Sequence, residues 1–248
     1  MHIIRSEYLS KTYLTNRKNG FEVNVLKGIK LEIEKGDYIG IMGKSGSGKT
    51  TLLNIIGSLD TPTSGNIYYY TDNYSNMNFS QVEDFRRKKV GYIFQDFRLV
   101  DTLTLKDNII LPMLFDGKAV EECDKRVMEL TEKFDIQKLL SKYPYEISGG
   151  EKQRTAICRA MANDPEVILA DEPTGNLDSQ AATKVVEEID KINNELGKTV
   201  ILVTHDPEIA SHCKKIFFLK DGQIFDVMDE IEDRKLFYNK ILKQMYEL

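Results

Sequence analysis

Three short, continuously apolar segments stand out in the pattern of hydrophobic and polar residues along the chain. They are YIGIM at 38–42, VILA at 167–170 and TVILV at 199–203. Runs of this length are typical of strands buried on both faces of a parallel sheet. Residues able to take part in phosphate chemistry follow these segments directly or one position later: Gly43, Asp171 and His205. Because ligands of open α/β sheets bind beyond the carboxyl ends of the strands, the pattern predicts one site built from three distant segments.

Helical periodicity occupies much of the chain between these segments. The predicted helices cover 49–58, 118–140, 149–162 and 179–196, and the second presents Val120, Cys123, Val127, Leu130 and Phe134 on one face. The order of strands, loops and helices indicates an α/β fold with a mostly parallel sheet. Apolar and polar residues alternate around turn glycines at 8–16, 23–36 and 65–70, which predicts a flanking antiparallel sheet.

The length of 248 residues is compatible with one large domain that contains an insert. We expect a core from 1–95 and 166–225, which includes the antiparallel sheet, and an inserted helical subdomain at 96–165. Residues 226–248 form a predicted helical tail with an apolar side made of Leu236, Phe237, Ile241, Leu242 and Met245. Packing of this tail on its own domain is the favoured interpretation, and contact with a partner or a membrane surface is the alternative.

Composition narrows the classes of function. The chain has 34 Lys and Arg residues and 39 Asp and Glu residues, which give a net charge of −5, so no overall positive field attracts nucleic acid. The basic segment RRKK at 86–89 is interpreted as a solvated helix end. Three widely spaced cysteines favour a reducing cytosol over a disulfide framework or a zinc site. The apolar runs are far shorter than the ~20 residues of a membrane-spanning helix. If the protein serves a membrane, another chain is expected to span it.

The stretch GKSGSGKT at 43–50 has the spacing of a phosphate-binding loop between a strand and a helix. Its glycines allow the backbone N–H groups of 46–50 to surround phosphates at a helix N-terminus. Lys49 is expected to neutralise the β and γ oxygens, and the Thr50 hydroxyl to ligate Mg²⁺. In VILADE, Asp171 is expected to face the metal and Glu172 to act on the attacking water. These features alone indicate an ATP- or GTP-hydrolysing enzyme.

A second glycine-rich turn, ISGGEKQR at 147–154, narrows the prediction further. The sequence resembles the nucleotide-binding subunits of ABC transporters, whose signature motif is usually written LSGGQ. The resemblance extends over nearly the whole chain through Tyr13, Gln95, NLD at 176–178 and His205, in the order in which this family carries them. It implies a P-loop fold of the ABC type over 1–248, with 96–165 as the helical signature subdomain.

The resemblance also implies a role for each matching residue. Glu172, His205 and Gln95 would be catalytic, and Thr50, Gln95 and Asp171 would lie at Mg²⁺. The residues expected to contact ATP are Tyr13, Gly43, Ser45, Gly46, Gly48, Lys49, Thr50, Thr51, Ser148, Gly149, Gly150 and Asp178.

In this family two subunits pair head to tail, with each ATP between the phosphate loop of one and the signature motif of the other. A homodimer with ATP at its interface is therefore expected. Two positions depart from the usual signature motif: Ile147 replaces Leu, a change that costs little, and Glu151 replaces the commoner Gln and adds a negative charge.

Two stretches resemble the exporter-like branch of the macrolide and lipoprotein-release ATPases: DFRRKKVGYIFQDFRLVDTLTLKDNIILPM at 84–113 and DEPTGNLDS at 171–179. Within this branch, FQDFRLVDTLTLKDNI at 94–109 and KYPYEISGG at 142–150 are most similar to the bacitracin-type peptide-resistance ATPases. The resemblance implies a cytoplasmic subunit held at the inner face of the membrane by a permease, which docks near Phe97, Arg98 and Leu99. The work done would be antimicrobial-peptide export, detoxification or resistance. The alternatives are an ABC-type ATPase that drives a cell-division or signalling partner, and a nucleotide-binding module that signals without hydrolysis.

Overall fold

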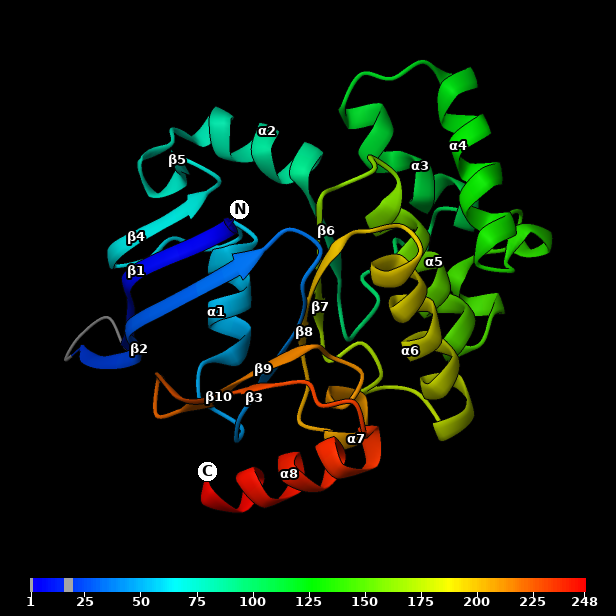
Figure 1. Cartoon of the computed structure of the whole chain (residues 1–248). Helices are drawn as coiled ribbons and strands as arrows, with labels where there is room; N and C mark the ends of the chain where they lie inside the picture. Colours follow the sequence, from blue (N-terminus) through cyan, green and yellow to red (C-terminus); the bar gives the residue numbers. More distant parts are fainter. Residues whose placement is uncertain (1, 16–19) are drawn as a thin grey trace. The chain divides into compact units, whose positions relative to one another are not determined.

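The three apolar segments all form strands that are buried along their length (Figure 1). They are β3 (Tyr38–Met42), β7 (Val167–Asp171) and β8 (Thr199–Val203). Every residue of β3 and β8 is buried, and in β7 only the terminal Asp171 is partly exposed. The prediction of three buried strands is confirmed.

The structure is a computed structural model that describes residues 2–15 and 20–248, so Asn16 of the predicted 8–16 strand lies outside the described residues. Contacts divide the chain into a first unit, Met1–Val82 with Ile201–Leu248, and a second unit, Glu83–Val200. The chain passes from one unit to the other within α2 (Phe79–Lys89) and within β8. These limits differ from the predicted 96–165 subdomain, which stays a prediction about how the chain is organised.

The first unit contains the expected antiparallel sheet. Its strands, in the order β2-β1-β4-β5, are β1 (His2–Thr15), β2 (Phe21–Glu34), β4 (Ser64–Tyr69) and β5 (Asp72–Asn73). β1 begins well before the predicted 8–16 segment because Ile3 and Ile4 are buried at its start. The second half of β2 alternates buried and exposed residues, as a strand with one face on the core requires.

The first unit also contains the strands and helices around the glycine-rich loop. β3 runs parallel to β9 (Lys215–Lys220), and β9 pairs with β10 (Gln223–Asp229) in antiparallel orientation. Helix α1 (Lys49–Ile56) follows the loop, and the hydroxyl of Tyr74 in the 3₁₀ turn η1 (Tyr74–Asn76) donates to the last carbonyl groups of α1. The helix predicted at 49–58 is present and begins where expected, but it ends at Ile56, where Gly57 is the C-cap.

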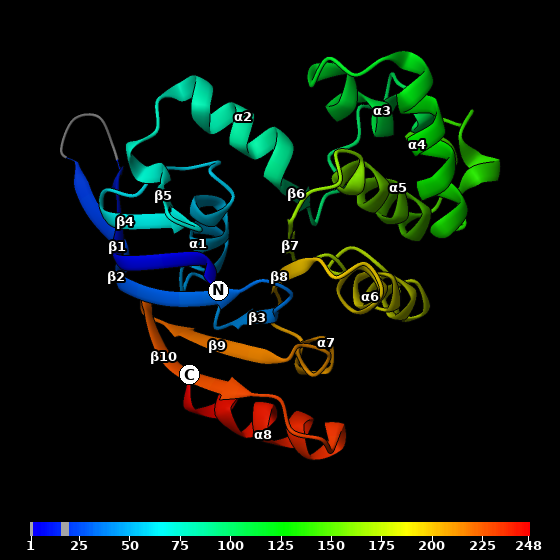
Figure 2. The ribbon, with the colours of Figure 1, turned by 45° about the horizontal axis from the view of Figure 1, so that its top comes forward.

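The predicted helical tail is wrong in its first part. Residues 226–229 belong to β10 because they pair with β9, and helix α8 (Arg234–Glu247) begins only after Asp233, whose carboxylate accepts the Leu236 N–H group at 3.0 Å. Of the five residues expected on one apolar side, only Phe237 and Ile241 are buried. α8 lies beside α7 (Pro207–Ala210) and β10 in the first unit, as Figures 1 and 2 show, so the tail packs on its own unit.

The second unit is mainly helical around a pair of parallel strands, β6 (Val90–Ile93) and β7. Its helices are α3 (Leu105–Phe115), α4 (Val120–Lys133), α5 (Gly149–Met161) and α6 (Ser179–Asn194), with 3₁₀ turns η2 (Gln137–Leu139) and η3 (Pro144–Glu146). Between 96 and 165 every element is helical, as expected.

The basic run at 86–89 forms the last turn of α2 and makes ion pairs with Asp84, Asp116 and Glu166, so its prediction as a helix end is confirmed.

The helix predicted at 118–140 ends early. α4 stops at Lys133, and Asp135 has a φ of +51°, a left-handed backbone conformation that a continuing helix does not contain. Four of the five residues predicted on its apolar face are buried, but Val120 in the first turn is 57% exposed.

No helix of the described residues has the length and apolar character needed to cross a membrane.

Neighbouring residues of α8 allow a matched test of how the tail packs. Phe237 is fully buried, whereas Leu236 is 51% exposed. We expect Phe237→Ala to lower the free energy of unfolding by about 3–5 kcal/mol, because it removes a buried aromatic side chain and leaves a cavity. Leu236→Ala should cost less than about 1 kcal/mol. Urea unfolding followed by circular dichroism measures both, and equal losses would contradict this packing.

Candidate functional site

The glycine-rich loop between β3 and α1 is held by close backbone approaches. A Cβ on Gly43 would lie 2.2 Å from the carbonyl oxygen of Leu219 in β9, so no larger residue fits without moving a strand. Gly46 and Gly48 have φ values of +78° and +105°, which glycine adopts without strain. The loop therefore places the N-terminus of α1 close to the end of β3. The free N–H groups of this first helical turn are suited to binding a phosphate group.

Lys49 lies at the first position of α1 and is buried. Its ammonium group donates to the carbonyl oxygens of Gly43 at 2.9 Å and Lys44 at 3.0 Å, so the cation is held over the loop. Thr50, the next residue, is exposed at the helix N-terminus, where a hydroxyl ligand of Mg²⁺ is expected. The loop thus combines N–H donors, a fixed cation and an accessible hydroxyl group.

Tyr13 of β1 is anchored at its hydroxyl end. The hydroxyl group donates to Asp60 at 2.6 Å, and the Lys11 ammonium lies 4.8 Å from the ring centroid and pairs with the other oxygen of Asp60. Burial and the hydrogen bond to Asp60 raise the pKa of the Tyr13 hydroxyl. The ring remains 38% exposed, so a face is available for the predicted stacking on adenine. Lys11 and Asp60 were not singled out in the sequence, because neither lies in a recognisable motif.

His205 is exposed directly after β8 and the buried residue Thr204. The Thr204 hydroxyl accepts the Asp206 N–H group at 3.0 Å, and the Asp206 carboxylate accepts the Glu208 N–H group at 2.8 Å as the cap of α7. The backbone on either side of His205 is therefore held by hydrogen bonds directly after the end of β8.

In the second unit, β7 ends at the two predicted acidic residues. Asp171 is the last residue of the strand, and its negative charge together with burial raises the pKa of Tyr92 on β6, with burial as the larger cause. Glu172 has a φ of +42°, a left-handed conformation that costs free energy in a residue other than glycine. The chain therefore turns sharply between the end of β7 and the segment that follows Glu172.

Gln95 lies beside the segment that follows these acidic residues. A Cβ on Gly175 would lie 2.6 Å from the Gln95 side-chain nitrogen, and the Asn176 side chain donates to the Gln95 carbonyl oxygen at 3.0 Å. Fully buried Gln153 of α5 donates to the carbonyl oxygens of Pro173 at 2.7 Å and Phe94 at 3.3 Å, and so joins the two loops. The sequence analysis missed Gln153, although the helical period places it on the same face of α5 as Ile157.

The signature turn begins helix α5. Ser148 is its N-cap, and the Glu151 carboxylate accepts both the Ser148 N–H group at 2.8 Å and the Ser148 hydroxyl at 2.7 Å. These two hydrogen bonds are the main cause of the lowered pKa of Glu151, which burial opposes. The departure from glutamine thus produces a capping box with a charged acceptor.

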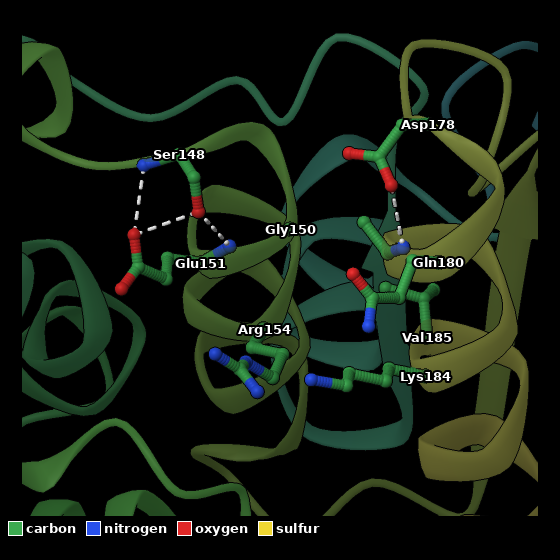
Figure 3. Close-up of a pocket in the computed structure, with 9 residues that line it drawn as sticks. Ser148, Gly150, Glu151, Arg154, Asp178, Gln180, Lys184 and Val185 are labelled. Carbon is green, nitrogen blue, oxygen red and sulfur yellow. Dashed lines mark hydrogen bonds between the residues drawn. The ribbon is translucent and has the colours of Figure 1, made fainter.

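Asp178 caps the neighbouring helix α6, where its carboxylate accepts the Ala181 N–H group at 2.9 Å. A Cβ on Gly150 would lie 3.1 Å from the Ala181 Cβ atom, so the glycine allows the first turns of the two helices to approach closely. Ser148, Gly150 and Asp178 line a pocket of about 200 Å³ between these turns (Figure 3). The structure therefore brings together two motifs that are about thirty positions apart.

The predicted site residues form two groups. The first unit holds Tyr13, the loop residues Gly43, Ser45, Gly46, Gly48, Lys49, Thr50 and Thr51, and His205, and the second holds Gln95, Ser148, Gly149, Gly150, Asp171, Glu172 and Asp178. Tyr13 lies within β1, and the other residues lie at or just after strand ends or near the starts of helices.

Comparison with known proteins identifies the family. The family model described as ABC transporter matches residues 26–175. The chain belongs to the ABC transporter ATP-binding family. It is 42% identical to the uncharacterized ABC transporter ATP-binding protein YvcR of Bacillus subtilis over 98% of this chain and 93% of that protein. It is 39% identical to the bacitracin export ATP-binding protein BceA of Halalkalibacterium halodurans over 98% and 95% of the two chains.

A solved structure has the same fold. It is the dimeric structure of a post-hydrolysis state of the ATP-binding cassette MJ0796 of Methanocaldococcus jannaschii, bound to ADP and Pi. The match has a TM-score of 0.83 and 38% sequence identity, and it covers 91% of this chain and 98% of that chain. The predicted α/β fold of the ABC type is confirmed. This chain is an ATP-binding, ATP-hydrolysing subunit of an ABC transporter.

The charged capping box of this ABC cassette predicts a pH-dependent contribution to stability. A carboxyl group with a lowered folded-state pKa stabilises the fold above its unfolded pKa, about 4.3 for Glu, and this contribution is lost as the pH falls through the folded-state pKa. We expect Glu151→Gln to lower the free energy of unfolding by about 0.5–1.5 kcal/mol at neutral pH, with the difference from wild type shrinking below about pH 4.3.

Urea unfolding at several pH values measures this difference. Glu132→Gln is the matched control, because Glu132 is exposed on α4 and its side chain makes no hydrogen bond or ion pair within the described ranges 2–15 and 20–248. A Glu151→Gln difference that is constant or grows toward low pH would contradict the assignment.

Proposed function

We propose that two copies of this chain pair head to tail and enclose ATP between the phosphate loop of one copy and the signature turn of the other. This proposal rests on a second helix start that is suited to an anion. Ser148 caps α5, Gly149 and Gly150 form its first turn, and the capped start of α6 lies beside it. A helix N-terminus with a hydroxyl group and glycines suits a phosphate oxyanion. A relative with 38% identity has been solved as a dimer bound to ADP and Pi.

Residues from both units would take part in binding ATP and Mg²⁺. The backbone N–H groups of 46–50 and the Lys49 ammonium would hold the phosphates of ATP, and Tyr13 would stack on adenine. The Thr50 hydroxyl and the Asp171 carboxylate would hold Mg²⁺, since both are hard oxygen ligands and Mg²⁺ takes its remaining ligands from phosphates and water. The bound cation would neutralise charge on the phosphate oxygens.

Glu172 would act as the general base in hydrolysis. Its carboxylate would accept a proton from a water molecule as the water oxygen bonds to the γ-phosphorus and the bond from that phosphorus to the bridging oxygen of ADP breaks. His205 would donate a hydrogen bond to the γ-phosphate, and Gln95 would orient the water near the metal. Asp178, which caps α6 in the structure, would orient the site that faces it in the second copy.

A membrane permease is the proposed partner, and it would hold this subunit at the cytoplasmic face of the membrane. Arg159 donates to the carbonyl oxygens of Phe97 and Arg98, which both have left-handed φ values, and so fixes the segment at which docking is expected. Arg159 also lines a groove that combines apolar and charged side chains, and Phe115 in it is 71% exposed. The other lining residues are Glu83, Arg86, Arg87, Leu111 and Pro112. Exposed apolar side chains around a fixed segment suit a protein partner.

Resistance to a bacitracin-like antimicrobial peptide is the proposed biological role, through export or detoxification. This proposal is supported by 39% identity to a bacitracin export ATP-binding protein over 98% of the chain. The resemblance includes the segment after Gln95, where the permease would dock. The specificity for the peptide would lie in the permease, because the cassette itself binds ATP.

The dimer proposal predicts the behaviour of Glu172→Gln. Without the carboxylate base, we expect hydrolysis to fall about 10²–10⁴-fold while ATP binding remains, so a closed dimer accumulates. Size-exclusion chromatography with light scattering, with and without Mg-ATP, measures the mass. Adding Ser148→Arg should abolish the dimer, because the arginine side chain would occupy the space at the start of α5 where the phosphate of ATP is proposed to bind. A monomer with retained hydrolysis would argue against both roles.

The resistance proposal is tested in cells that carry the gene. Its deletion should raise sensitivity to bacitracin, and wild-type protein but not Glu172→Gln should restore resistance, because transport needs hydrolysis. Sensitivity to an antibiotic with an intracellular target serves as the control. Unchanged bacitracin sensitivity with a cell-division defect would favour the alternative non-transport role.

A further inference from the structure

Tyr13 is held in place by two charged side chains that belong to no motif of the sequence. Lys11 and Tyr13 are two positions apart in β1, so their side chains lie on the same face of the strand. The Lys11 ammonium lies over the Tyr13 ring, 4.8 Å from its centroid. Asp60 accepts hydrogen bonds from both the ammonium and the Tyr13 hydroxyl group. All three residues belong to the first unit, and we call them the Tyr13 cluster.

The charges of the Tyr13 cluster are compensated within it. Lys11 is only 9% exposed, and burial of an ammonium group is costly unless acceptors surround it. Its Nζ atom donates to one carboxylate oxygen of Asp60 at 2.5 Å and to the Thr61 carbonyl oxygen at 2.7 Å. The other carboxylate oxygen accepts the Tyr13 hydroxyl at 2.6 Å. Burial raises the pKa of Asp60, but the hydrogen bonds from Lys11 and Tyr13 outweigh this effect and lower the pKa.

Asp60 is itself placed by the helix that begins at the phosphate loop. The Asn54 carbonyl oxygen in the last turn of α1 accepts the Asp60 N–H group at 3.3 Å. The chain then runs along β1, where Thr63 donates its N–H group to the Ser10 carbonyl oxygen at 2.8 Å. Tyr13 is therefore connected through Asp60 and α1 to the loop that is proposed to bind the phosphates.

The contacts of the Tyr13 cluster restrict how the ring can move. An unrestrained tyrosine side chain loses rotational freedom when a base stacks on it, which weakens binding. Here the hydroxyl is fixed by Asp60 and one face of the ring lies under the Lys11 ammonium, so this freedom is already lost when the protein folds. Tyr13 is still 38% exposed, and a base would stack on the face opposite Lys11.

We propose that Lys11 and Asp60 are positioning residues for the adenine base of the nucleotide. They hold the Tyr13 ring at a fixed place relative to the phosphate loop, so that one nucleotide can reach both. Both residues act through Tyr13, and the inference rests on the stacking of Tyr13 on adenine proposed above. In the simpler interpretation, Lys11 and Asp60 form an ion pair that only stabilises the fold.

The test compares Mg-ADP with Mg-pyrophosphate, which has two phosphates but no base. Isothermal titration calorimetry measures both dissociation constants. We expect Tyr13→Ala to weaken ADP binding at least about tenfold, because an aromatic–base stack is lost. Asp60→Ala and Lys11→Met should weaken ADP binding about three- to tenfold, because the ring is then free to rotate. Pyrophosphate binding should change less than about twofold, because the phosphate loop is unaltered, and this also shows that each variant is folded.

A double-mutant cycle separates positioning from a structural role. In the Tyr13→Ala background, Asp60→Ala and Lys11→Met should leave the affinity for ADP unchanged, because no ring remains to be positioned. Asp60→Asn retains an acceptor for the Tyr13 hydroxyl and should recover part of the affinity that Asp60→Ala loses. Lys30→Met is the matched control and should change neither affinity, since Lys30 also lies over a tyrosine ring of the first unit, that of Tyr8 at 3.8 Å.

Contrary results would separate this inference from the proposed function. If Tyr13→Ala weakens ADP binding but Asp60→Ala or Lys11→Met does not, the proposed stacking stands and the positioning role is overturned. A parallel loss of ADP and pyrophosphate affinity, or a loss that persists in the Tyr13→Ala background, assigns the ion pair to stability alone and also overturns the inference. If Tyr13→Ala binds ADP as the wild type does, the proposed stacking fails and the inference fails with it.

Discussion

The geometry of the phosphate loop depends on one close approach between two backbones. A side chain on Gly43 would collide with the Leu219 carbonyl oxygen, so only glycine allows β3 and β9 to lie this close at the point where the chain leaves the sheet. The loop then turns through two left-handed glycines into α1, and Lys49 returns to the Gly43 carbonyl oxygen. Packing between distant strands thus sets the position of the cation that meets phosphate.

The second unit repeats this use of glycine at helix starts. Gly149 and Gly150 let the first turn of α5 lie against Leu177 and Ala181, and each helix is closed by a side-chain cap. The buried Gln153 joins the loops that follow β6 and β7. The proposed site residues of this unit are therefore held both by close backbone packing and by buried or capping side chains such as Gln153, Ser148 and Asp178.

Charge in the signature region is balanced locally. The glutamate at 151 adds a negative charge, but its carboxylate is bound to Ser148, and Arg154 lies close enough to lower its pKa further. The cost of the unusual residue is offset by a stronger helix cap. Arg154 and Lys184 place positive charge at the pocket between the first turns of α5 and α6 (Figure 3).

The sequence by itself determined the family, the three buried strands and the motif residues, because these depend on local spacing: a phosphate loop needs glycines at set positions, and a buried strand needs a continuous apolar run. Periodicity could not show that 226–229 pair with β9, that α4 ends at Lys133, or that Val120 is exposed, since pairing and burial depend on distant neighbours. Only the tertiary structure decided that Gln153 joins two loops and that Arg154 faces Lys184. Those relations exist only once separate helices and strands are packed together.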